Sequence, residues 1–138
     1  MYLVDTSVWI DFLRGRKAAH VDALAALLHG DEVVGTAPIV LQEILQGADS
    51  EDRFEQWRKY FGELLCYVPD DPIGTHIAAA RLYQQCRRNG TTPRSSNDCL
   101  IAQLAMEHGL LLLHNDRDFE AIAAVAPALR FYGGAANR

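Results

Sequence analysis

The chain has 138 residues, 49% of them hydrophobic, and a formal net charge of −5. This length predicts one domain over residues 1–138, with enough apolar residues for a buried core. No stretch approaches the ~20 apolar residues of a membrane span, and the apolar start of the chain meets a charge at Asp5. We therefore expect neither a membrane segment nor a secretory signal.

The three cysteines, Cys66, Cys86 and Cys99, are odd in number and lack CxxC spacing. This pattern is typical of free thiols in a reducing compartment, so it predicts a cytoplasmic protein without a disulfide framework or a zinc site.

Short apolar runs alternate with longer helical patterns along the chain. The expected strands are Tyr2–Val4, Glu32–Gly35, Leu65–Val68, Leu110–Leu113 and Leu129–Tyr132. The expected helices are Val8–Leu13, Val21–Leu28, Ile39–Gln46, Glu51–Leu64, Ile73–Arg88, Ser96–His108 and Asp116–Ala124. Thr6 or Ser7 can cap the first helix. The alternation predicts an α/β fold with parallel strands covered on both faces.

Several acids lie where such a sheet places a ligand site, beyond the carboxyl ends of its strands. Asp5 and Asp116 each follow an expected strand, and Asp98 lies in the first turn of an expected helix. Asp118 is a second acid beside Asp116, and either residue could cap a helix. Carboxylates gathered in this way favour a hard cation such as Mg²⁺ or Mn²⁺. Glu43 has no such placement, and a solvated helix face explains it.

The negative charge at first argues against a nucleic-acid partner. The chain has 18 acids and 13 bases, so setting aside the four acids above and Glu43 leaves 13 acids against 13 bases. Basic residues gather in two segments, one with Arg14, Arg16 and Lys17 and one with Arg81, Arg87, Arg88 and Arg94. Solvated helix faces explain these groups equally well.

Four sequence blocks together resemble the PIN domain, and more narrowly the VapC toxins of bacterial toxin–antitoxin pairs. They are Asp5-Thr6-Ser7, Glu43 in a helix opened by Pro38, the run from Asn97 to Ala102, and the run from His114 to Phe119. The likeness covers the whole chain in order and spacing. It implies a three-layer α/β/α fold, a homodimer, Mg²⁺- or Mn²⁺-dependent cleavage of RNA such as tRNA or rRNA, and inhibition by a VapB-like antitoxin.

The resemblance also assigns roles to residues. The family's acidic quartet falls on Asp5, Glu43, Asp98 and Asp116, and Asp118 matches an additional acid, so Glu43 enters through the resemblance alone. The metal ligands would be Asp5, Asp98, Asp116 and Asp118. Ser7 and Asn97 would orient the carboxylates, and Arg87 or Arg94 could hold RNA phosphates.

His114 stands where many members of the family have Thr. A histidine at a strand end more often makes a structural hydrogen bond than binds a metal, and we favour that interpretation here. Whether its ring N–H replaces the bond from the Thr hydroxyl to a carboxylate stays open at this stage.

Two rival functions remain. An aspartyl-phosphate phosphatase or phosphoacceptor domain could use Asp5 as nucleophile, but Ser7 stands where such phosphatases need a second acid. The other rival is a non-catalytic PIN-like binding module, against which the full acidic set argues.

An antitoxin would need an exposed apolar groove. The candidates are Trp9, Phe12 and Leu13 near the start of the chain and Trp57, Tyr60 and Phe61 further along. Burial in the core is the alternative for most of these side chains.

Overall fold

A five-stranded parallel sheet lies at the centre of the protein, described over residues 1–133 in a computed structural model. The strands follow the order β3-β2-β1-β4-β5, and every pairing is parallel. They are β1 (Tyr2–Val4), β2 (Val34–Thr36), β3 (Leu65–Cys66), β4 (Leu111–Leu113) and β5 (Arg130–Phe131). The parallel α/β sheet is therefore confirmed. Residues 134–138 of the predicted single domain lie outside the described residues, and that domain assignment stays a prediction.

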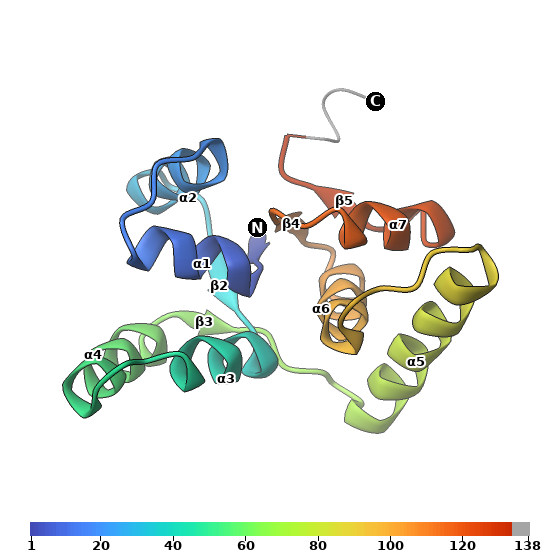
Figure 1. Ribbon diagram of the computed structural model, residues 1–138, viewed down its shortest axis with the longest axis horizontal. Coiled ribbons are helices and arrows are strands. Elements are labelled where there is room, and N and C mark those ends of the chain that lie inside the picture. Colours follow the sequence, from blue (N-terminus) through green and yellow to red (C-terminus); the bar gives the residue numbers. More distant parts are fainter. Residues whose placement is uncertain (134–138) are drawn as a thin grey trace.

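Helices cover both faces of the sheet, and within the described residues there are seven (Figure 1). They are α1 (Thr6–Leu13), α2 (Ala19–His29), α3 (Pro38–Gln46), α4 (Glu51–Gly62), α5 (Pro72–Arg88), α6 (Ser96–Glu107) and α7 (Asp118–Val125). The connections from β1 to β3 step towards one edge of the sheet, and those from β3 to β5 step the other way. Right-handed crossovers therefore place α1–α4 on one face and α5–α7 on the other. The three-layer α/β/α fold is confirmed.

The central strands are buried on both faces, as their uninterrupted apolar sequences require. Leu3, Val4 and Leu112 are fully buried. Gly35 in β2 is covered by the ring of Tyr67, because a Cβ at residue 35 would lie only 2.3 Å from a ring carbon. A side chain at this position would displace the ring from the sheet.

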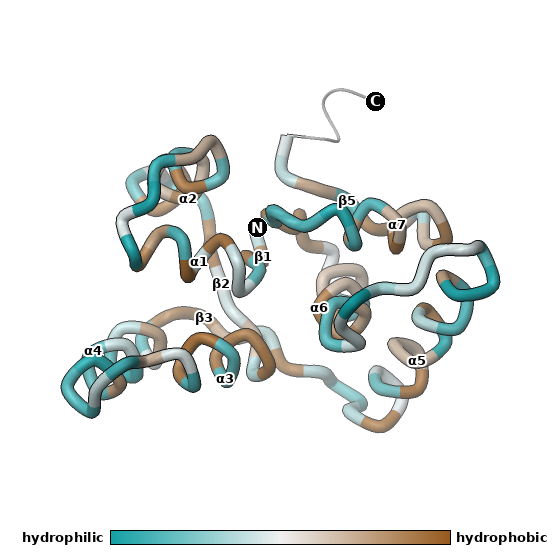
Figure 2. The backbone as a smooth tube through the Cα atoms, in the orientation of Figure 1, coloured by the Kyte–Doolittle hydropathy of each residue, from teal (hydrophilic) through white to brown (hydrophobic). Residues whose placement is uncertain are grey.

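An aromatic cluster joins α1 to α4 on one side of the sheet. Trp9 is fully buried, and its ring meets the edge of Phe61 with the centroids 4.9 Å apart. Edge-to-face contacts of this kind stabilise a core beyond the area that they bury. Outside this contact α4 is largely hydrophilic, in contrast to the hydrophobic colour of α3 (Figure 2). The cluster therefore helps to hold α4 in the layer, together with the packing of α4 against α3.

The first and the last helix begin in ways that differ from expectation. Asp5, and not Thr6 or Ser7, caps α1, since its carboxylate accepts the backbone N–H of Ser7. The prediction for this cap was wrong because a carboxylate serves a helix N-terminus as well as a hydroxyl does. The last helix begins at Asp118, because the N–H of Asp116 bonds to His114 and that of Asp118 bonds to Asp116.

The helices can also be compared with the length and apolar character that a membrane span requires. No helix within residues 1–133 is both long enough and apolar enough to cross a membrane.

Candidate metal centre

The sheet reverses its direction of winding between β1 and β4, and the acids collect beyond that point. The chain from β1 turns towards β2, whereas the chain from β4 turns towards β5. The backbone N–H of Asp5, just after β1, donates to the carbonyl of Leu113 at the end of β4 (2.9 Å). This bond joins the two strand ends, so the side chains that follow them share one crevice.

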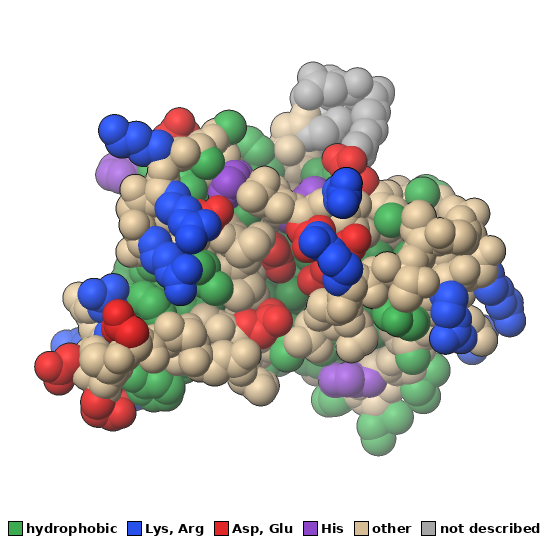
Figure 3. Space-filling model, in the orientation of Figure 1, with side chains coloured by type: hydrophobic (Ala, Val, Ile, Leu, Met, Phe, Trp, Pro, Cys, Tyr) green, Lys and Arg blue, Asp and Glu red, His purple; other side chains and the backbone are tan. Residues whose placement is uncertain are grey.

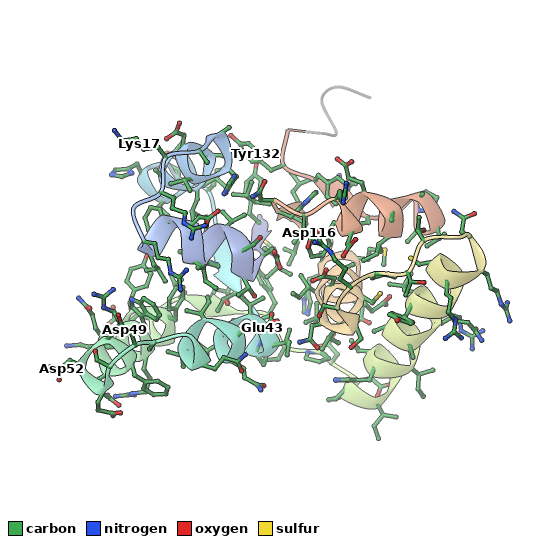
Figure 4. The ribbon with its side chains drawn as sticks, in the orientation of Figure 1. Lys17, Glu43, Asp49, Asp52, Asp116 and Tyr132 are labelled. Carbon is green, nitrogen blue, oxygen red and sulfur yellow. The ribbon has the colours of Figure 1, made fainter. Side chains whose placement is uncertain are left out.

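Figure 3 shows acidic side chains gathered in the centre of one face, with basic side chains directly beside them. In Figure 4, Asp116 and Glu43 lie near this centre, whereas Asp49 and Asp52 lie far out towards α4. Glu43 comes from α3, whereas Asp116 comes from the loop that leads from β4 to α7. The fold thus brings together acids that are far apart in the sequence.

Asp5 is buried, with 5% of its surface exposed. Its Oδ2 accepts the hydroxyl of Ser7 at 2.7 Å and the Ser7 backbone N–H at 3.3 Å. Burial raises the pKa of Asp5, the hydrogen bonds from Ser7 and Thr6 oppose the shift, and the charge of Glu43 adds to it. The Ser7 hydroxyl therefore lies where the family likeness placed it.

Glu43 lies on α3 and is held from two sides by neutral donors. The hydroxyl of Thr6 donates to Oε1 at 2.8 Å, and the side-chain amide of Asn97 donates to Oε2 at 3.3 Å. Asn97, expected to orient carboxylates, thus contacts Glu43. Thr6 was missed as a site residue, although its place directly after Asp5 could have drawn attention to it. These two bonds link α1, α3 and α6 across the mouth of the site.

Asp98 is the least compensated acid of the group. Among residues 1–133 no hydrogen bond reaches its carboxylate. Burial is the largest cause that raises its pKa, and the charges of Asp5, Asp116, Asp118 and Glu43 add to the shift in that order, so that the pKa reaches about 7. The other four sequence-predicted acids are thus close enough to influence Asp98.

Asp116 and Asp118 share an arginine. Arg94 Nη2 donates to Asp116 Oδ1 at 2.7 Å, and Nε donates to Asp118 Oδ2 at 3.1 Å. The backbone N–H of Arg94 reaches the same Asp118 oxygen at 3.0 Å. Burial acts to raise the pKa of Asp118, but the bonds from Arg94 outweigh it and leave that pKa below its usual value.

Arg87 is in a different position. It lies in the last turn of α5 and lines a hollow with Arg81 and Gln84. Within residues 1–133 it forms no ion pair with any of the five acids. Of the two arginines selected from the sequence, the fold thus brings only Arg94 to the acidic group.

His114 has a structural role in this arrangement. Its Nδ1 accepts the backbone N–H of Asp116 at 3.1 Å, and its ring packs against Phe119 and Phe131 with centroids 5.0 and 4.4 Å apart. Burial lowers the pKa of His114, which favours the neutral ring that such an acceptor needs. The question left open by the sequence is therefore answered, since Nδ1 accepts a backbone bond and the ring donates to no carboxylate within residues 1–133.

The geometry fits a divalent cation. Asp98, Asp116 and Asp118 each offer a carboxylate oxygen, and the three oxygens lie within 4.8 Å of one another. Oxygen donors and concentrated negative charge suit Mg²⁺ or Mn²⁺. Asp5 lies outside this group of three and borders it through its charge on Asp98. The half-buried carboxylate of Asp98, which accepts no hydrogen bond within residues 1–133, is the observation that best fits a cation site, because a carboxylate partly removed from water without a partner costs free energy.

Comparisons with known proteins give consistent matches. A model of the PIN domain matches residues 2–125. The VapC ribonuclease Mb1587 of Mycobacterium bovis is 35% identical over 126 residues, covering 91% of this chain and 93% of that protein. The ribonuclease VapC32 of Mycobacterium tuberculosis is 31% identical over 124 residues, covering 90% and 91%.

Solved structures match the fold over nearly the whole chain. VapBC2 from Rickettsia felis, bound to a promoter DNA fragment, gives a TM-score of 0.72 at 18% identity and covers 95% of this chain and 96% of that chain. VapBC-1 from nontypeable Haemophilus influenzae gives 0.71 at 19% identity with the same coverage. At these identities the likeness concerns the fold alone.

Proposed function

The chain belongs to the PIN domain family, and on that premise we propose that it is a metal-dependent endoribonuclease, the toxin of a VapC-type toxin–antitoxin pair. The cluster of Asp98, Asp116 and Asp118 at the strand ends carries the proposal. Its support comes from curated relatives that are named ribonucleases and match over nine tenths of the chain.

In this proposal Asp98, Asp116 and Asp118 hold Mg²⁺ or Mn²⁺, with Asp5 beside them. When bound, the cation would supply an activated water and offset negative charge on the scissile phosphate. Asp98 has to lose its proton to serve as a ligand, and its raised pKa of about 7 makes that loss incomplete in neutral metal-free solution.

Glu43 has a different task. Its two oxygens are fixed by Thr6 and Asn97, so its carboxylate is held in one orientation towards the acidic group. Both donors are neutral, so neither brings a positive charge to the Glu43 carboxylate. A carboxylate held in this way can position the attacking water and accept its proton. Ser7 holds Asp5 in the corresponding way on the other side.

The decisive experiment incubates the purified chain with tRNA and ribosomal RNA in Mg²⁺, in Mn²⁺ or in excess EDTA. We expect cleavage with either metal and none with EDTA. Asp49→Asn is a matched control, because Asp49 is an exposed acid remote from the cluster and its loss should leave cleavage unchanged (Figure 4).

A folded chain that binds the metal but cuts no RNA would instead support the rival non-catalytic module. A simpler first experiment expresses the chain in cells. Growth arrest that Asp5→Asn relieves is the expected result.

The antitoxin partner is also part of the proposal. Of the apolar residues considered from the sequence, Trp9, Trp57 and Phe61 are buried. Phe12, Leu13 and Tyr60 line a hollow of about 510 Å³ between α1 and α4, with Arg53 at its wall. An apolar groove with a basic edge suits a partner segment with apolar and acidic residues. Tyr60→Ala should weaken co-purification with the antitoxin and leave RNA cleavage intact.

A homodimer is proposed as well. Ile73 and Ile77 on α5 are 75% and 58% exposed, and with Pro72, His76 and Ala80 they line an apolar hollow. Exposed apolar residues gathered on one helix are typical of an interface. Sedimentation should show a dimer at micromolar concentration, which Ile73→Glu with Ile77→Glu converts to monomer. A stable monomer of the unmodified chain would contradict this assignment.

A further inference from the structure

The side chain of Arg94 uses only one edge of its guanidinium group inside the protein. A guanidinium carries five N–H donors, and the Nε–H and one Nη2–H lie on the same edge. These two donate to Asp118 and Asp116, respectively. Within residues 1–133 no partner takes the other three N–H groups, two on Nη1 and one on Nη2. They form the outer end of the plane, where two parallel N–H bonds can be made.

That outer end faces solvent, and the residue as a whole is fixed. The side chain of Arg94 is 69% exposed, although Asp116 and Asp118 are only 24% and 15% exposed. The backbone N–H of Arg94 also bonds to Asp118, so the segment before α6 is tied to the start of α7. An exposed arginine usually loses side-chain conformational entropy when it binds a ligand. Here the bonds to Asp116 and Asp118 already restrict the side chain, so binding should cause a smaller further loss.

We propose that Arg94 is a positioned phosphate anchor, with its inner edge fixed to Asp116 and Asp118 and its outer end holding a phosphate of the RNA next to the scissile one. The inference rests on the proposed ribonuclease function and names the residue that orients its substrate. A planar fork that binds phosphate through two donors is the geometry that arginine offers and lysine lacks.

The same two carboxylates thus serve both the cation and the substrate. Each has one oxygen occupied by Arg94 and a second oxygen to which no residue in 1–133 donates a hydrogen bond. The occupied oxygens orient the arginine, and the remaining ones are available to a cation. A bound cation and an anchored phosphate would therefore be positioned by the same two carboxylate groups.

The test measures RNA binding in an Asp98→Asn background, which prevents cleavage, at fixed Mg²⁺ and varied KCl. Each phosphate contact made by a basic residue contributes about 0.7 to the slope of log K against log salt for single-stranded RNA. We expect Arg94→Met to lower this slope by roughly that amount and to weaken binding at low salt roughly three- to tenfold. Arg94→Lys should keep most of the slope and only part of the affinity.

Arg58→Met is the matched control. Arg58 donates through the same two atoms, Nε and Nη2, to Glu55 on α4, far from the acidic centre (Figure 1). Its loss should leave the slope unchanged. An unchanged slope in Arg94→Met, or an equal loss in Arg58→Met, would overturn the assignment.

A second measurement needs no variant of Arg94 and so does not depend on its folding. In nitrogen-15 spectra of the Asp98→Asn chain, added RNA should shift the Nη signals of Arg94 and leave its Nε–H signal in place. Nη signals that RNA does not move would contradict the proposal. RNA cleavage by the unmodified chain, measured in parallel, separates this failure from failure of the ribonuclease function itself.

Discussion

The site contains two groups of acids that the protein treats differently. Asp5 and Glu43 are held by neutral donors, namely two hydroxyl groups, backbone N–H and a side-chain amide. In the second group, the charged donor Arg94 bonds to Asp116 and Asp118. The third member, Asp98, accepts no hydrogen bond from its side-chain neighbours within residues 1–133. We refer to these as the hydrogen-bonded pair and the open triad.

The contrast shows how a protein can fix a carboxylate without neutralising it. Neutral donors orient the pair and bring no positive charge to it. The triad is left with excess charge in a partly buried place, which a cation can offset. The triad is therefore suited to bind the ion, and the pair is suited to shape its surroundings.

The largest effect should follow from removing a member of the triad. Asp98→Asn should lower RNA cleavage by at least about 100-fold, since even residues that only support metal ligands cost ten- to 100-fold. Circular dichroism should show an unchanged fold. Activity close to that of the unmodified chain would show that Asp98 has no role in the mechanism. The hydrogen-bonded pair and the open triad would then not differ in function.

A smaller loss should follow from freeing a member of the pair. Asn97→Ala and Thr6→Val each remove one donor to Glu43, and we expect roughly tenfold lower cleavage from either. Metal affinity, measured by calorimetry, should change little because the side chains of Thr6 and Asn97 donate to Glu43 and not to the triad. If both variants lost metal binding as Asp98→Asn does, the two groups would be one functional unit.

The smallest effect concerns stability in the absence of metal. The pKa of Asp98 is about 7 in the folded chain, against an ordinary value of 3.8, so between about pH 4 and pH 7 the folded state binds more protons than the unfolded state. Stability from this group therefore falls as pH rises through that window and is constant above it.

Asp98→Asn should accordingly be more stable than the unmodified chain at pH 8 and nearly equal at pH 4. We expect the free energies of unfolding of the two proteins to differ by about 1 kcal/mol at pH 8. A pKa shift corresponds to about 1.4 kcal/mol per unit, and solvent screening at this partly exposed site reduces that contribution. Urea unfolding in EDTA at the two pH values measures it, and Asp49→Asn should show no such change. A gain that is equal at both pH values would contradict the raised pKa.

Much of the fold could be predicted because its signals are local. Apolar runs such as Leu111–Leu113 and helix stops such as Gly109 lie close together in the chain, and the element order followed from them. Element ends were less predictable. The helix expected from Asp116 begins at Asp118, because the ring of His114 and the carboxylate of Asp116 organise the turn before it.

The site could be predicted only in part, because some of its signals are local in the sequence and others are not. Asp5 and Asp116 could be selected from their places after strands, but nothing near Glu43 marks it, since its partners Thr6 and Asn97 lie 37 and 54 residues away in the chain. Arg94 was visible as a basic residue, whereas its bonds to two acids depend on how α6 and α7 meet.

By itself the sequence determined the alternation of elements, the parallel sheet and the presence of surplus acids at strand ends. Periodic burial and turn residues encode these features over a few residues each. Only the tertiary structure decided which acids are paired, which is left open, and what Arg94 contacts. Those outcomes depend on side chains from α1, α3, α6 and the loops before α6 and α7 meeting at one end of the sheet, and that meeting is set by packing over the whole chain.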